Sequence, residues 1–62
     1  MTRFLRLPAV IEITGLNRAT IYEMVDRGDF PKPARIGARA IAWPSNEIQS
    51  WADERLAERD AA

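Results

Sequence analysis

Apolar residues near the start of the chain recur at the spacing of an amphipathic helix. Leu7 and Ile11 lie one helical turn apart, and Pro8 suits the first turn, where its missing N–H is not needed. Gly15 follows the apolar stripe and can end a helix. The pattern therefore predicts a helix over residues 8–14.

A second helical stripe begins after a short connection that contains glycine. Ile21 and Val25 are spaced for one helix face, Asn17 is a strong N-cap residue, and Gly28 marks the end. These signals predict a helix over residues 18–27. Two short helices joined in this way are typical of a helix-turn-helix, in which the second helix reads DNA.

The next segment cannot be helical, because residues 30–33 hold two prolines. Short apolar runs on either side of Gly37 predict a β-hairpin, or wing, over residues 34–43 with a tight turn at the glycine. Pairing through such a turn would place three large apolar side chains on one face of the wing: Ile36, Ile41 and Trp43.

Start signals for a last helix follow the wing directly. Pro44 fits the first helical position and Ser45 fits the N-cap, and the sequence does not decide between these two starts. We expect a helix over residues 46–59. Its apolar stripe contains Ile48, Trp51, Ala52 and Leu56.

Together these elements predict the fold class. We expect a small α+β fold, mostly α: a winged helix-turn-helix with three helices and a two-stranded β-hairpin wing, in one domain over residues 1–62. A chain of this length has room for one minimal core. The predicted core residues are Leu7, Ile11, Leu16, Ile21, Val25, Phe30, Ile41, Trp43, Ile48 and Trp51.

Composition narrows the function classes. The chain has no cysteine and no histidine, so it lacks the usual ligands of a zinc site and the usual nucleophiles and bases of an enzyme. We therefore predict no catalytic residue, no metal and no cofactor. The longest apolar run, residues 40–43, is far too short to cross a membrane, and no signal segment is visible. We expect a cytoplasmic protein without a membrane partner.

The net charge of zero conceals a dipole. Residues 1–39 carry a formal charge of +3, and residues 40–62 carry −3. Eight of the nine cations are arginine, whose planar guanidinium binds phosphate and guanine in bidentate fashion. The charge pattern alone favours a solvated surface of mixed charge, but within a helix-turn-helix it indicates a basic DNA-facing half.

Several segments resemble the AlpA family of prophage regulators over nearly the whole chain. They are RLP at 6–8, TGLNRATIY at 14–22, GDFPKP at 28–33, GARAIAW at 37–43 and IQSW at 48–51. The resemblance implies a winged-helix fold similar to excisionases and MerR-type proteins. It also implies a phage-linked transcriptional regulator that controls integrase expression and excision. Glu23 and Asp26 depart from the family pattern, in which the position of Glu23 is often basic or neutral.

Helical geometry predicts which side of the second helix faces DNA. With Ile21 and Val25 inward, the opposite face is centred on Ala19 and Glu23. Arg18 could bind guanine O6 and N7, Tyr22 a phosphate, and Glu23 a cytosine amino group. The predicted contacts on this helix are Asn17, Arg18, Ala19, Thr20, Tyr22, Glu23 and Arg27.

Each of these residues also has a structural interpretation. Arg18 could be a solvated surface residue, Asn17 and Thr20 could only begin the helix, and Glu23 could pair with Arg27 at i+4. On the wing we predict that Arg39 enters the minor groove or contacts the backbone. Two further cations, Lys32 and Arg35, are predicted phosphate contacts.

We thus predict a sequence-specific regulator that binds double-stranded DNA. Two alternatives stay open: an excisionase-like factor that bends attachment-site DNA, and a protein-interaction or antitoxin-like adaptor. A single module of this kind buries about 600 to 1,000 Å² on DNA, which seldom gives strong sequence specificity. We therefore expect a homodimer or cooperative assembly on DNA. The acidic last helix would be repelled by DNA, and it suits a neighbouring copy, RNA polymerase or phage integrase.

Overall fold

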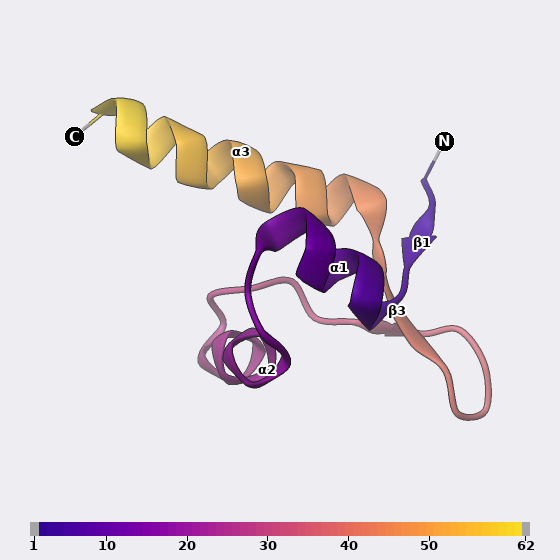
Figure 1. Ribbon diagram of the computed structural model, residues 1–62. Helices are drawn as coiled ribbons and strands as arrows, with labels where there is room; N and C mark the ends of the chain where they lie inside the picture. The colour runs from indigo at the N-terminus through magenta and orange to yellow at the C-terminus, as the bar shows by residue number, and fades with distance from the viewer. Residues whose placement is uncertain (1, 62) are drawn as a thin grey trace.

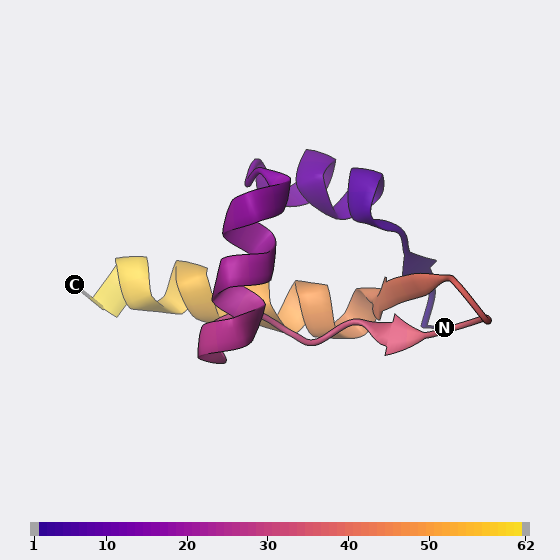
Figure 2. The ribbon, with the colours of Figure 1, turned by 90° about the horizontal axis from the view of Figure 1, so that it is seen from below.

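A computed structural model describes residues 2–61 and shows three helices around a small sheet (Figures 1 and 2). This small, mostly helical α+β fold confirms the predicted class. In chain order the elements are β1 (Phe4–Leu5), α1 (Leu7–Thr14), α2 (Arg18–Arg27), β2 (Ala34–Arg35), β3 (Ile41–Pro44) and α3 (Ser45–Ala61). The three predicted helices are present, each within two residues of its expected bounds.

Local hydrogen bonds and a glycine fix the connection between α1 and α2. Gly15 adopts φ 74°, where a side chain would be strained, and its N–H donates to the Ile11 carbonyl at 2.8 Å. The Thr14 hydroxyl donates to the Val10 carbonyl at 2.8 Å and accepts from the Leu16 N–H at 3.2 Å. The connection between α1 and α2 is therefore held by hydrogen bonds, which fixes the direction in which α2 leaves α1.

The predicted two-stranded wing is present as β2 and β3, but the sheet has a third strand, β1, that the sequence did not predict. The strand order is β1-β3-β2, with both pairings antiparallel. Phe4 lies opposite Pro44, and the pairing extends beyond β1, where the Ser45 N–H donates to the Arg3 carbonyl at 2.7 Å. No local pattern marks β1, because it has only two residues and its partner strand lies far along the chain.

The hairpin turn is wider than predicted. Its last backbone bond runs from the Ile36 N–H to the Ala40 carbonyl at 2.9 Å, and Gly37 has no positive φ. Because Arg35 lies opposite Ile41, Ile36 belongs to the other face of the sheet and is 43% exposed. The prediction that Ile36 shares a face with Ile41 and Trp43 is therefore wrong.

The core lies between the helices and the inner face of the sheet. Its buried members are Val10, Ile21, Phe30, Trp43 and Ile48. The remaining predicted core residues, Leu7, Ile11, Leu16, Val25, Ile41 and Trp51, pack around this cluster and are half-buried. Val10 is missing from the prediction because its neighbours Leu7 and Ile11 have the larger side chains on the same stripe.

Both tryptophans anchor the chain around Phe30 through their indole N–H groups. Trp43 Nε1 donates to the Pro31 carbonyl at 2.8 Å, and Trp51 Nε1 donates to the Asp29 carbonyl at 2.9 Å. The ring of Phe30 meets that of Trp51 edge-on, with centroids 4.8 Å apart. These bonds hold residues 29–31 between the sheet and α3.

The last helix begins at Ser45 and continues past the other elements. Pro44 pairs with Phe4 in the sheet, so the alternative start at Pro44 is wrong. The C-terminal part of the helix projects away from the rest of the fold in both ribbon views (Figures 1 and 2), and residues 53–61 are all exposed. Leu56 is consequently 48% exposed, and the prediction that it belongs to the buried stripe is wrong.

Candidate nucleic-acid interface

The outward face of α2 is the one that sequence periodicity predicted. Ile21 is fully buried, while Arg18, Ala19 and Glu23 are exposed. At the far end, Gly28 takes φ 81°, and its N–H and that of the next residue donate to the last helical carbonyls. Both ends of α2 are therefore fixed, and its exposed face has one orientation relative to the core.

The N-terminus of α2 is capped as predicted. Asn17 Oδ1 accepts the Thr20 N–H at 2.8 Å, so its oxygen is occupied and its amide nitrogen is left for other partners. Thr20 is half-buried, whereas Arg18 and Ala19 are exposed. Among the predicted contacts in this turn, Arg18 and Ala19 are thus the most accessible.

Tyr22 lies at the border between the core and the exposed face. It is half-buried, and its ring centroid is 6.3 Å from that of Trp43 with the planes tilted by 53°. Such a residue can pack its ring against apolar neighbours and turn its hydroxyl to water. A structural role is therefore visible for Tyr22 in addition to the predicted phosphate contact.

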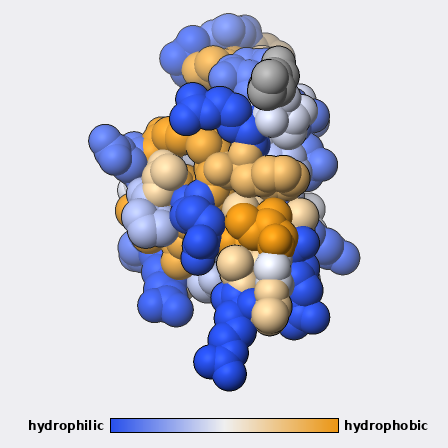
Figure 3. All heavy atoms as spheres, turned by 90° about the vertical axis from the view of Figure 1, so that its right-hand side faces the viewer, coloured by the Kyte–Doolittle hydropathy of each residue, from blue (hydrophilic) through white to orange (hydrophobic). Residues whose placement is uncertain are grey.

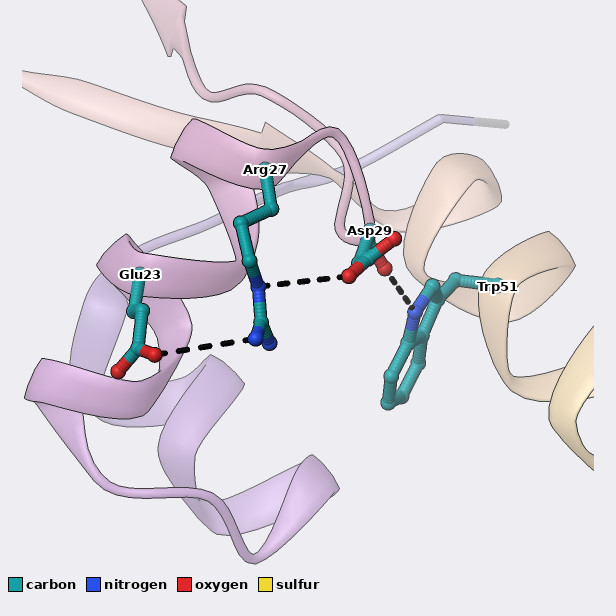
Figure 4. Close-up of polar contacts among 4 residues, drawn as sticks. All are labelled: Glu23, Arg27, Asp29 and Trp51. Carbon is teal, nitrogen blue, oxygen red and sulfur yellow. Dashed lines mark hydrogen bonds and ion pairs between the residues drawn. The ribbon is translucent and has the colours of Figure 1, made fainter.

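Arg27 lies between two carboxylates at the end of α2 (Figure 4). Its guanidinium is 3.8 Å from Glu23 Oε1 and 3.5 Å from Asp29 Oδ2. The alternative i+4 pair of Glu23 and Arg27 is therefore present. The backbone carbonyl of Asp29 also accepts the Trp51 indole N–H, so this group of contacts joins the outer face of α2 to α3.

The remaining cations divide by region. Arg55 pairs with Glu58 and Arg59 with Asp60, both on α3. Within residues 2–61, the six other cations have no carboxylate within the 4.0 Å limit of an ion pair: Arg3, Arg6, Arg18, Lys32, Arg35 and Arg39. The predicted DNA contacts Arg18, Lys32, Arg35 and Arg39 all fall in this exposed group.

The structure adds two cations that sequence reasoning missed. Arg3 and Arg6 flank β1 and thereby join the same sheet as the wing cations. The missed strand explains the omission, because only its pairing with β3 brings these arginines to the sheet. In residues 2–61 no helix is long and apolar enough to cross a membrane, and no group of three or more potential metal ligands occurs.

The second helix is capped and exposes an arginine at its start, and the hairpin carries further cations. These features define the chain as a small winged helix-turn-helix protein. A family model described as "Prophage CP4-57 regulatory protein (AlpA)" matches residues 3–56. The chain belongs to this AlpA family, which confirms the resemblance seen in the sequence.

Two curated proteins show the extent of this similarity. "DNA-binding transcriptional activator AlpA" of Escherichia coli (strain K12) is 44% identical, with 86% of this chain and 84% of that protein covered. "Uncharacterized protein ORF88" of Enterobacteria phage P4 is 42% identical, with 92% of this chain covered. The chain spans 65% of the length of the phage P4 protein.

Proposed function

We propose that this chain is a transcriptional regulator that binds double-stranded DNA in a sequence-specific manner and acts as one DNA-binding domain. The observation that carries the proposal is the position of Arg18. It is exposed, has no carboxylate partner within residues 2–61, and opens the helix that in this fold enters the major groove. The name of the Escherichia coli relative supports the same function.

In this proposal α2 reads base edges and the wing contacts phosphates. Arg18 and Ala19 lie where base edges can be reached, and a guanidinium can bind guanine O6 and N7 together. Lys32, Arg35 and Arg39 are exposed on the wing and its approach, where contacts to phosphate supply affinity without sequence information. No catalytic step is assigned to the chain.

The proposal for the regulated genes rests on the family resemblance. We propose a phage or prophage context in which the chain controls integrase and excision genes, with contacts to RNA polymerase or integrase made by its acidic helix. Genome-wide crosslinking of the tagged protein tests this directly. Peaks at promoters support the regulator, whereas peaks confined to attachment sites would indicate an excisionase-like factor.

Binding itself is tested by selection from a random duplex library followed by fluorescence anisotropy. We expect one enriched motif and an affinity that falls as salt rises, because each neutralised phosphate releases counterions. The acidic half of the chain provides a matched control: Glu54→Gln changes a residue of α3 rather than of α2 or the wing, and it should leave the selected motif unchanged. Absence of any duplex binding would instead favour a protein-interaction module.

A further inference from the structure

The three-stranded sheet has an outer face built from apolar side chains. Leu5 and its partner Trp43 point to the core, so Phe4 and its partner Pro44 point the other way. The pairing of Ala34 with Ala42 extends this face. The hydrogen bond from the Ile36 N–H to the Ala40 carbonyl extends it further. We call it the outer sheet face, and its members are Phe4, Ala34, Ile36, Ala40, Ala42 and Pro44.

On the outer sheet face Ala42 is buried and three neighbours are half-buried, namely Ala34, Ala40 and Pro44, so its exposed apolar side chains are Phe4 and Ile36. Phe4 is 56% exposed and Ile36 is 43% exposed, and neither packs against the core cluster, whereas Leu5 and Ile41 do. Figure 3 looks at the side of the molecule that carries β1 and the hairpin, and it shows hydrophobic side chains gathered in the centre, with hydrophilic side chains among and around them. Exposed apolar surface of this kind marks interaction sites.

The segments that form this face carry charges of one sign. Before Glu12 and between Pro31 and Asn46 the chain contains no acidic residue. Five cations lie in these segments: Arg3, Arg6, Lys32, Arg35 and Arg39. A partner for the outer sheet face should therefore present an apolar centre flanked by carboxylates. Packing of two outer sheet faces on each other would instead bring like charges together.

The projecting half of α3 has this chemistry. Leu56 is 48% exposed, and every residue from 53 to 61 is exposed. Helical periodicity places Asp53, Arg59 and Asp60 beside Leu56, at i−3, i+3 and i+4, and Arg59 pairs with Asp60 at 3.1 Å. The helix has a formal charge of −3. We call the surface around Leu56 the acidic helix face.

We propose that the acidic helix face of one copy binds the outer sheet face of a second copy. The two surfaces lie at opposite ends of the molecule in both ribbon views, so they cannot meet within one chain (Figures 1 and 2). The contact is head-to-tail, and each added copy leaves one surface of each kind free for another copy. Neighbouring copies could thus associate in a row, and this association does not depend on DNA binding.

Directed crosslinking tests the pairing, because the natural chain contains no cysteine. Ile36→Cys and Leu56→Cys change exposed side chains and should not disturb the fold. When the two variants are mixed without DNA in a glutathione redox buffer, we expect the main product to be a disulfide-linked heterodimer that contains one copy of each variant. Ile13→Cys is the matched control, because Ile13 is 59% exposed and lies on α1.

The expected ratio is roughly tenfold in favour of the Ile36→Cys pair over the Ile13→Cys pair when each is mixed with Leu56→Cys, because only a formed contact raises the local thiol concentration. Raising the salt concentration should reduce that ratio. Equal yields for the two pairs would overturn the proposal. A dominant homodimer of Ile36→Cys would also overturn it, since that product indicates contact between two outer sheet faces.

Sedimentation of complementary variants gives an independent test. A helix half on a small sheet buries less than about 1,200 Å², so we expect weak association at high protein concentration. Ile36→Asp and Leu56→Asp should each be monomeric, and their mixture should form a 1:1 dimer, because one intact pair of surfaces remains. A mixture that stays monomeric where the natural chain associates would contradict the head-to-tail contact.

Discussion

The proposed recognition helix α2 and the hairpin both present arginines that have no carboxylate partner within residues 2–61, yet they are built very differently. α2 has a side-chain cap at one end and a left-handed glycine at the other, and it buries Ile21 completely. The hairpin has a strand of two residues, and residues 36–39 at its tip are all exposed. Rigid placement suits the reading of base edges, whereas an exposed tip suits contacts to the phosphate backbone.

This difference indicates where sequence preference resides. The backbone that carries Arg18 is held to the core through Ile21 and the Asn17 cap, so the position from which its side chain extends is fixed. An arginine on the hairpin tip has few contacts that fix its direction. We therefore expect α2 to decide which sequence is bound and the hairpin to contribute affinity on every sequence.

The largest expected effect is on the free energy of unfolding, and it comes from replacing Trp43, the residue that joins the two regions. Trp43 belongs to β3, is fully buried and packs near Tyr22 of α2. Trp43→Ala should lower the free energy of unfolding by about 3 to 5 kcal/mol, enough to unfold a domain of this size. Urea denaturation followed by circular dichroism measures it. Trp51→Ala should cost less, because Trp51 is half-buried. An unchanged midpoint for Trp43→Ala would refute the described core.

Replacement of Arg18 should act on discrimination rather than on stability. Arg18→Ala is expected to remove about 1 to 3 kcal/mol of preference for the cognate base at one position, because one bidentate contact to guanine is lost. Anisotropy titrations on duplexes with single base changes measure this. Arg18→Lys is the matched variant: it keeps the charge but loses the planar fork, so it should restore affinity without restoring the preference.

The cap of α2 separates stability from binding. Asn17→Ala should cost about 1 kcal/mol of unfolding free energy, because the Thr20 N–H loses its acceptor. Asn17→Asp keeps an acceptor and should retain stability, but it adds a negative charge at the start of the proposed reading face. Thermal melts and DNA titrations of the two variants should therefore rank in opposite orders of damage. Parallel losses in both assays would contradict this separation.

The smallest expected effect concerns the carboxylate beside Arg27. Glu23→Gln should change the unfolding free energy by no more than about 0.5 kcal/mol, since the 3.8 Å ion pair is exposed. It should also strengthen binding to all duplexes modestly at low salt, because a negative charge leaves the DNA side and Arg27 is freed. A change in base preference would instead show that Glu23 reads a base.

Sequence reasoning succeeded where signals are local. The Asn17 cap, the glycines at the helix ends and the apolar stripe of α2 sufficed to place the helix pair and its exposed face. It failed where the outcome depended on distant pairing. β1 forms only because Phe4 and Leu5 meet β3, and the register of the sheet also turned Ile36 outward. Leu56 has the spacing of a core residue, but it is 48% exposed on the projecting part of α3.

The central claim, that α2 chooses the sequence and the hairpin does not, is tested most directly by salt-titrated binding to cognate and scrambled duplexes. Arg18→Ala should reduce the ratio of cognate to scrambled affinity. Arg35→Ala and Arg39→Ala should weaken both duplexes equally and flatten the slope of log K against log salt by about 0.9 for each lost phosphate contact. If Arg39→Ala alone changes the ratio while Arg18→Ala weakens both duplexes equally, the hairpin reads the sequence and the account is wrong.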